Sequence, residues 1–242
     1  MTMRVRLDQI HRSFNMQIPS KPIHSSQTAP HEDLLPLLDK YRRSVFQKPI
    51  AEHTRAAFEH AERIVRAANR PLILDSCCGV GMSTVHLADT FPEHFVLGID
   101  KSAARIAKHH AYREEAINNY ALVRADVIDF WRLAAQYEWR VARHFLLYPN
   151  PWPKITALKK RFHGHPAFVD LIKLGAYFEV RSNWQIYLRE FEAAFWHCTG
   201  VRGTLESFAP ARPITPFEKK YLHAGHELFR LRIAYDFDKM RD

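Results

Sequence analysis

Cysteine is scarce in this chain, and long apolar stretches are missing. Three cysteines among 242 residues, Cys77, Cys78 and Cys198, are too few for a disulfide framework and lack C-x-x-C spacing, which favours a reducing, cytoplasmic compartment. No apolar run approaches the ~20 residues that a helix needs to cross a bilayer, so we expect no membrane span. The N-terminus lacks the apolar core of a secretory signal, so we expect no export.

Metal-binding patterns and internal repeats are also missing. The pairs His163/His165 and His223/His226 lack the spacing of zinc proteases or zinc fingers, and no cysteine supports either pair, so we expect no metal. Residues 1–30 begin with arginines and then carry three prolines, which predicts a flexible basic arm before a single domain over 31–242. The sequence does not distinguish a monomer from a homodimer.

Charge is strongly unbalanced. Thirty-five Lys and Arg against 26 Asp and Glu give a formal net charge of +9. Such an excess favours a polyanionic partner, with nucleic acid ahead of an acidic membrane surface, although solubility alone is the other interpretation. Hydrophobic residues make up 47% of the chain, which supplies a sizeable core and excludes wholesale disorder.

Short apolar runs alternate with segments of helical periodicity. The predicted strands are 72–75, 95–100, 121–123, 145–148 and 177–180, with two more near 204–208 and 229–235. The predicted helices are 51–68, 84–88, 102–118, 128–138, 166–174 and 184–196. This alternation predicts an α/β fold with a mostly parallel, seven-stranded sheet and helices on both faces. Ligands of such folds bind beyond the carboxyl ends of the strands.

A glycine-containing turn follows the first predicted strand. Gly79 and Gly81 let the backbone approach a ligand, and the next helix offers free N–H groups, although a tight turn without a ligand has the same pattern. Asp100 closes the second strand, where it can accept hydrogen bonds from both hydroxyls of a ribose. Asp126 closes the third strand, where it can accept from an adenine amine. Each acid alone is equally compatible with a helix N-cap.

The missing third glycine of G-x-G-x-x-G disfavours a dinucleotide, and S-adenosylmethionine fits better because it is a nucleoside without phosphates. Asp75 would then hold its cationic methionine end, since a buried positive charge needs a partner. The predicted cofactor-binding residues are Asp75, Cys78, Gly79, Gly81, Asp100, Lys101, Asp126 and Asn150.

Four motifs follow one another from about residue 70 to the C-terminus. They are the loop 75–81, the strand end 97–100, the proline-rich segment 148–154 and the Thr-Pro-Phe-Glu segment 215–218. Together they resemble the bacterial tRNA (guanine-N7)-methyltransferases, whose first loop reads acid-x-Gly-Cys-Gly-x-Gly, with Cys77 here in place of the first glycine. The resemblance implies a Rossmann-like class I methyltransferase fold, S-adenosylmethionine as cofactor and RNA, specifically tRNA, as partner.

The resemblance also implies roles for individual residues. Asn150 stands where the family has a catalytic Asp, and Asn183 stands where it has an Asp that contacts the target base. The residues implied to bind substrate are Lys154, Lys159, Lys160, Arg161, Asn183, Thr215, Phe217 and Glu218. The basic ones would contact phosphates, and Glu218 would accept from the guanine edge. The family's further basic residues are replaced at 155–157, which thins the RNA contacts.

Methylation of guanine N7 tolerates the exchange at position 150. The attacking nitrogen uses a ring lone pair and loses no proton, so a carboxylate would help only by electrostatics. Asn150 keeps an acceptor but lacks the charge, which we expect to slow the reaction about ten- to thirtyfold. Trp152 would stack on a flipped base if it is exposed and would belong to the core if it is buried.

Three functions are compatible with these residues. The first is an S-adenosylmethionine-dependent RNA methyltransferase that acts on guanine N7 of tRNA. The second is a diverged member that methylates another base, another RNA or a small molecule, for which Asn150-Pro151-Trp152 offers a partial likeness to the Asn-Pro-Pro-aromatic turn of amino-methylating enzymes. The third is an RNA-binding protein that kept the fold without catalysis.

Overall fold

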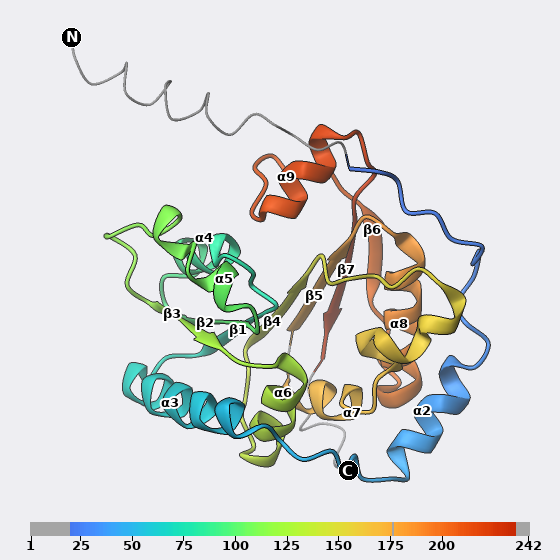
Figure 1. The fold of residues 1–242 in the computed structure, drawn as a ribbon, viewed down its shortest axis with the longest axis horizontal. Helices are drawn as coiled ribbons and strands as arrows, with labels where there is room; N and C mark the ends of the chain where they lie inside the picture. Colours follow the sequence, from blue (N-terminus) through green and yellow to red (C-terminus); the bar gives the residue numbers. More distant parts are fainter. Residues whose placement is uncertain (1–19, 176, 236–242) are drawn as a thin grey trace.

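A twisted sheet of seven strands forms the centre of the molecule (Figure 1), in a computed structural model that describes residues 20–175 and 177–235. The strand order is β3-β2-β1-β4-β5-β7-β6. The strands are β1 (Leu72–Ser76), β2 (Phe95–Asp100), β3 (Tyr120–Arg124), β4 (Arg143–Leu147), β5 (Tyr177–Ser182), β6 (Thr204–Ser207) and β7 (Phe229–Ala234). Strand β7 is antiparallel to β5 and β6, and the pairs from β3 to β5 are parallel, which confirms the predicted fold class.

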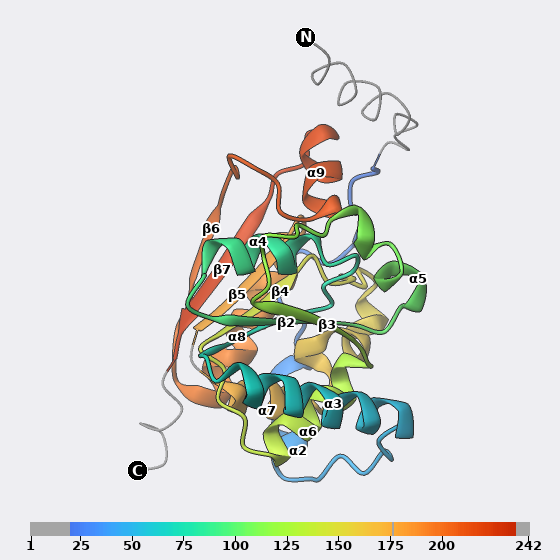
Figure 2. The same ribbon diagram turned by 90° about the vertical axis from the view of Figure 1, so that its left-hand side faces the viewer.

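Helices cover both faces of the sheet (Figure 2). They are α2 (Leu34–Arg42), α3 (Glu52–Ala68), α4 (Met82–Thr90), α5 (Ala103–Ile106), α6 (Val127–Gln136), α7 (Phe168–Leu171), α8 (Gln185–Thr199) and α9 (Pro216–His223). Short 3-10 turns are η1 (His109–Ala111), η2 (Ile155–Lys160), η3 (Phe162–Gly164) and η4 (Ile172–Leu174). One apolar core lies between the sheet and α2, α3, α6, α7 and α8, and a smaller one lies on the face that α4 covers.

Strand β1 shows why the central strands are apolar throughout. Leu72 and Leu74 pack into the larger core, while Ile73 between them packs with Leu87 of α4 on the other face. Successive side chains of a strand point to opposite faces, so a strand covered on both sides buries every residue. The same alternation directs Asp75 towards α4, and its neighbour Ser76 towards Trp131 of α6.

The segment predicted as a helix over 102–118 is mostly irregular. It contains the single turn α5 and the 3-10 turn η1, and neither contributes a buried residue. Most helical stability in proteins comes from packing an apolar face, and this segment has none to pack. His109 instead contacts the Val80 carbonyl and the Tyr120 hydroxyl, at 3.1 and 3.0 Å.

Residues 20–30 have no helix or strand but pack on the domain. The Ser25 hydroxyl donates to the Pro153 carbonyl at 2.6 Å, and the buried Gln27 donates to Glu190 of α8 at 2.5 Å. We therefore count residues 20–30 with the domain rather than with the arm predicted for residues 1–30. Residues 1–19 of that arm lie outside the described residues.

Candidate active site

Three carboxylates lie at or near the carboxyl ends of the adjacent strands β1, β2 and β3. Asp75 is the fourth residue of β1, Asp100 ends β2, and Asp126 lies two residues beyond β3. Cys77 lies among them: burial first, and then the charges of Asp100, Asp75 and Asp126, raise the pKa of its thiol to about 12. The topology thus gathers the three acids that the sequence separates.

Asp75 is a buried carboxylate with one oxygen in use. Its Oδ2 accepts hydrogen bonds from the hydroxyls of Ser83 and Thr84, both at 2.7 Å, in the first turn of α4. Its Oδ1 is buried without a hydrogen-bond partner. Burial raises the pKa of Asp75 to about 6, so the group is ionised at neutral pH. An ionised oxygen without a partner suits a ligand that brings a cation.

The loop after β1 is shaped by three residues of positive φ: Cys77 at 63°, Gly79 at 63° and Gly81 at 77°. A Cβ atom on Gly79 would meet no atom within 4 Å, so this part of the loop is open to a ligand. A Cβ atom on Gly81 would lie 2.7 Å from the His109 ring, so His109 braces the loop from behind. Cys78 is buried, and its N–H donates to the carbonyl of Ile99, so its side chain packs rather than facing the open surface.

Asp100 and Asp126 differ in how their carboxylates are used. Asp100 is buried and accepts from the N–H groups of Ser102 and Gly79, at 2.8 and 3.0 Å, which ties the loop to the end of β2. The N-cap of α5 is Ser102, so Asp100 is not the helix cap. Asp126 does cap α6, because its Oδ1 accepts from the N–H of Ile128 at 3.0 Å. Lys101 beside them is exposed.

The proline-rich segment after β4 forms a tight turn with Tyr148 and Trp152 at positive φ. Asn150 is exposed, and its Oδ1 accepts from the N–H of Trp152 at 3.2 Å. The Trp152 side chain is 38% exposed, and the Lys160 ammonium lies 4.8 Å from the centre of its ring. Exposure favours the stacking role of Trp152 over the core role.

The predicted basic cluster is only partly on the surface. Lys154, Lys159 and Lys160 are exposed along η2. Arg161, predicted to contact phosphate, is 0% exposed, and its guanidinium pairs with Glu190 at 2.5 Å. The phosphate role of Arg161 is therefore wrong, because a fully buried cation already paired with a carboxylate has no surface to offer.

The Thr-Pro-Phe-Glu segment begins helix α9. Thr215 is buried and accepts from the N–H of Glu218 at 2.9 Å, as in a capping box. The Glu218 carboxylate is 0% exposed and accepts from the Tyr148 hydroxyl, Arg181 and the N–H of Ile214. The predicted contact of Glu218 with a guanine edge is therefore wrong, since the group is buried and both of its oxygens are in use. Oε1 ties α9 to Tyr148 and Arg181, and Oε2 accepts from Ile214 just before the helix. The Thr-x-x-Glu spacing, which is typical of a helix N-terminus, was the sequence pattern that indicated this structural role.

Two other predicted substrate residues lie near this helix. Phe217 is 41% exposed and stacks on Tyr221, with ring centres 6.2 Å apart. Asn183 follows β5 and is half-buried, with its amide nitrogen 3.0 Å from Nδ1 of His226. The sequence indicated no contact between Asn183 and His226, because 43 residues separate them.

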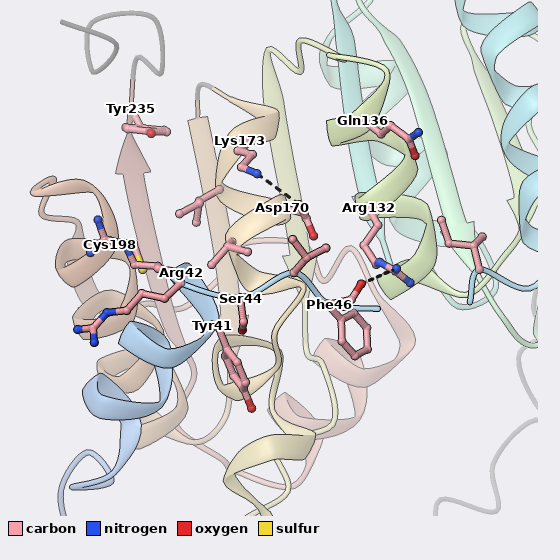
Figure 3. Close-up of a pocket in the computed structure, with 15 residues that line it drawn as sticks. Tyr41, Arg42, Ser44, Phe46, Arg132, Gln136, Asp170, Lys173, Cys198 and Tyr235 are labelled. Atoms are coloured by element: carbon pink, nitrogen blue, oxygen red, sulfur yellow. Dashed lines mark hydrogen bonds and ion pairs between the residues drawn. The ribbon is translucent and has the colours of Figure 1, made fainter. Parts of the chain in front are cut away.

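A pocket lies away from this edge of the sheet (Figure 3). It measures about 710 Å³ and is lined by residues from the end of α2, the segment 43–50, α6, α7, η4, α8 and Tyr235. It contains none of the predicted cofactor- or substrate-binding residues. Within the described ranges, no group of three or more His, Cys, Asp or Glu side chains is arranged to hold a metal, and no helix has the length and apolarity to cross a bilayer.

A known family accounts for this arrangement. The profile of the putative methyltransferase family matches residues 69–231, which include strands β1 to β6, the first half of β7 and all of the strand-end acids. The chain belongs to this family. The match confirms the methyltransferase activity that the motifs predicted, with S-adenosylmethionine as cofactor.

Individual relatives of the family are similar over about two thirds of the chain. A tRNA (guanine-N(7)-)-methyltransferase of Nitrosospira multiformis is 26% identical over 174 residues, covering 69% of this chain and 75% of the relative. The enzyme of the same name from Bordetella pertussis is 28% identical over 169 residues, covering 66% of each chain. These matches confirm the resemblance found in the motifs.

Solved structures share the fold of the family. The 16S rRNA methyltransferase KamB has a TM-score of 0.53 at 13% identity and covers 78% of this chain and 95% of its own. The aminoglycoside resistance methyltransferase NpmB1 has a TM-score of 0.51 at 17% identity and covers 74% and 93%. At such low identity these likenesses show the class I fold alone.

The cofactor loop of this family member fits S-adenosylmethionine, which supplies an electrophilic methyl group when bound. The free Oδ1 of Asp75 suits its ammonium group, and the open surface at Gly79 leaves room for it. The carboxylates of Asp100 and Asp126 remain candidates for the ribose and the adenine. We assign these contacts as proposals from the chemistry of the donor set.

Cofactor affinity is expected to depend on the protonation of Asp75. Because burial raises the pKa of Asp75 to about 6, the carboxylate that holds a cation is lost as the pH falls through that value. We expect the Kd for S-adenosylmethionine to be constant above about pH 7 and to rise about tenfold per pH unit below about pH 6. Titration calorimetry between pH 5 and 8 measures this, and a Kd that does not change with pH would contradict the role of Asp75.

Proposed function

We propose that this protein transfers a methyl group from S-adenosylmethionine to N7 of a guanosine in tRNA, in the cytoplasm. The observation that carries the proposal is the exposed Trp152 under the Lys160 ammonium, in the turn after β4, at the same sheet edge as the cofactor loop. An aromatic plane beside a cation is the combination that stacks a base and neutralises its phosphate. The relatives named above act on tRNA guanine, which supports this choice of substrate.

The proposed reaction requires no proton transfer from N7 to the protein. The N7 lone pair forms the new bond to the methyl carbon while the carbon–sulfur bond breaks, and the purine becomes cationic. No proton leaves N7, so the residues need only orient the base and stabilise its developing charge. Asn150 can do so through the dipole of its exposed amide, while its Oδ1 keeps the turn in shape.

The identity of the labelled nucleoside tests the proposal. The purified protein is incubated with tritiated S-adenosylmethionine and total tRNA from cells that lack it, and the RNA is digested to nucleosides. We expect labelled 7-methylguanosine. A different labelled nucleoside would support the diverged enzyme that Asn150 and Asn183 suggest. Cofactor binding without label in any RNA would count against both.

A charge at position 150 is expected to accelerate the reaction. Asn150→Asp keeps the oxygen that accepts from the Trp152 N–H and adds a carboxylate beside the cationic purine. Charged hydrogen bonds exceed neutral ones by about 1–2 kcal/mol, so we expect kcat to rise about five- to thirtyfold. Single-turnover rates at saturating RNA measure the chemical step, and an unchanged or lower rate would place Asn150 outside it.

Removal of the exposed indole is expected to weaken RNA binding. Base–aromatic stacking contributes about 1–3 kcal/mol per base, so Trp152→Ala should raise the Kd for tRNA by about 5- to 150-fold, with Trp152→Phe between it and the wild type. Trp196 offers a matched control, because it is 43% exposed on α8 and is covered by Arg202. Trp196→Ala should leave the Kd unchanged. Equal effects of the two alanine variants would argue against a specific stack at Trp152.

A further inference from the structure

Asn183 directly follows β5, and its amide is oriented by a contact with His226. Strand β5 is parallel to β4, so Asn183 lies at the same edge as the turn of Asn150 and Trp152. Its Nδ2 lies 3.0 Å from Nδ1 of His226, and its Oδ1 has no hydrogen-bond partner among the described residues. An asparagine with one free end can present either a donor or an acceptor, so its other end determines which one the substrate meets.

His226 is held in one tautomer by a backbone carbonyl. Its Nε2 lies 3.1 Å from the carbonyl oxygen of Ser20, and a carbonyl only accepts, so the proton of the neutral ring is on Nε2. Nδ1 is then an acceptor and can take only the NH₂ group of Asn183. The ring also stacks on Tyr221, with the ring centres 5.3 Å and the planes 14° apart. A half-turn of the ring would put carbon atoms where its two nitrogens now bond.

We propose that His226 and the Ser20 carbonyl orient Asn183 as an acceptor-only contact, which makes Asn183 a determinant of base selectivity. The inference rests on the proposed function, because it concerns the base that enters that site. Guanine presents N1–H and N2–H donors on its Watson–Crick edge, whereas adenine presents an N1 acceptor. A freely turning amide would satisfy both bases, and the held amide offers adenine N1 no donor.

This orientation gives Asn183 the hydrogen-bonding character of a carboxylate without its charge. This chain has Asn183 where the resembled family has Asp, and the held amide would keep the site's preference for a base that carries hydrogen-bond donors on its edge. His226 acts as a positioning residue, since it contacts Asn183 and not the base.

Base selectivity in RNA with a single altered target nucleotide tests the proposal. The probes are RNAs with guanosine or 2-aminopurine at the target position, because 2-aminopurine keeps N7 but has an N1 acceptor. His226→Phe keeps the stack on Tyr221 and frees the Asn183 amide. We expect the ratio of kcat/KM for guanosine over 2-aminopurine to fall about three- to tenfold. Asn183→Asp in the same background should restore the ratio, because a carboxylate accepts whichever way it turns.

An exposed histidine three residues earlier, at the end of α9, provides the control. His223 is exposed and contacts only the Lys219 carbonyl, so His223→Phe should leave the ratio unchanged. An unchanged ratio in His226→Phe, with both proteins folded, would overturn the proposal.

The tautomer of His226 is measured independently of activity. Long-range ¹H–¹⁵N spectra of the labelled protein at about pH 8, where a free imidazole is neutral, should show the proton on Nε2. A proton on Nδ1 overturns the proposed orientation whether or not RNA is methylated. If the wild-type protein methylates no RNA, the proposed function and the base recognition fail together, while the spectrum still decides the orientation of Asn183.

Discussion

Replacing Asp75 by asparagine is expected to abolish most of the affinity for S-adenosylmethionine while making the protein more stable. The free Oδ1 of Asp75 is the proposed partner of the ligand's ammonium, and a charged hydrogen bond contributes about 1.5–3 kcal/mol, so we expect the Kd to rise about 10- to 150-fold. Asparagine keeps one oxygen for the hydroxyls of Ser83 and Thr84, which directs its NH₂ group towards the cation.

The gain in stability follows from the raised pKa of Asp75. Its pKa is about 6 in the folded protein, against an ordinary value of 3.8, because burial disfavours the charged form. Below pH 3.8 both states are protonated and no cost arises; the cost grows between 3.8 and 6 and is complete above pH 6. At pH 7 that cost is about 3 kcal/mol. The amide introduced by Asp75→Asn leaves a buried NH₂ group without a partner, which offsets part of the gain, so we expect the free energy of unfolding to rise by about 1–2 kcal/mol.

Calorimetric Kd values and urea denaturation at pH 7 measure the two effects. Asp129 provides the control, because it is buried in α6 but already paired with Arg132 at 3.1 Å. Asp129→Asn should lower stability and leave the Kd unchanged. Full cofactor affinity in Asp75→Asn would remove Asp75 from the site.

Replacing Glu190 by glutamine is expected to cost about 3–5 kcal/mol of stability, because it leaves the buried Arg161 without its countercharge. The Glu190 carboxylate is 0% exposed and accepts from Gln27, the His31 N–H, Arg161 and His163. Burial alone would raise the pKa of Glu190, but the hydrogen bond from His163 and the Arg161 charge hold it at about 2.

Chemical denaturation measures this cost against a partly exposed ion pair whose acid lies on the same helix. Glu192 pairs with Arg202, whose side chain is largely exposed, so Glu192→Gln should cost less than about 1 kcal/mol. The depressed pKa of Glu190 also sets a pH window: its contribution is complete above 4.5 and is lost as the pH falls towards 2. Similar costs for the two glutamine variants would show that the buried cluster does not hold residues 20–31 to the domain.

The strands could be predicted closely because both faces of the sheet are covered. Phe95–Asp100 forms a strand over the predicted range, since every residue of it is buried. The helix predicted over 102–118 was wrong, since helical spacing without an apolar face has nothing to pack against. Helix α2 was missed, and in the structure it packs on α8 through Leu34 and Leu38, a contact between distant parts of the chain.

The sequence predicted correctly the site residues whose positions depend on strand ends. It failed for the residues whose roles depend on burial. Asp75 and Asp100 lie together because parallel strands bring their carboxyl ends to one edge, a consequence of topology that local sequence indicates. Arg161 and Glu218 match the motifs equally well, yet both are internal. Their partners are Gln27, 134 residues away, and Tyr148, 70 residues away, so no local pattern distinguishes them from surface charges.

The sequence by itself determined the alternation of strands and helices, the glycine loop and the family, because these depend on the order and spacing of neighbouring residues. Only the tertiary structure decided which charges face solvent, which end of the Asn183 amide is free, and that Trp152 is exposed. These properties depend on contacts between segments far apart in the chain. Each polar group is satisfied, left free or buried according to what folds against it.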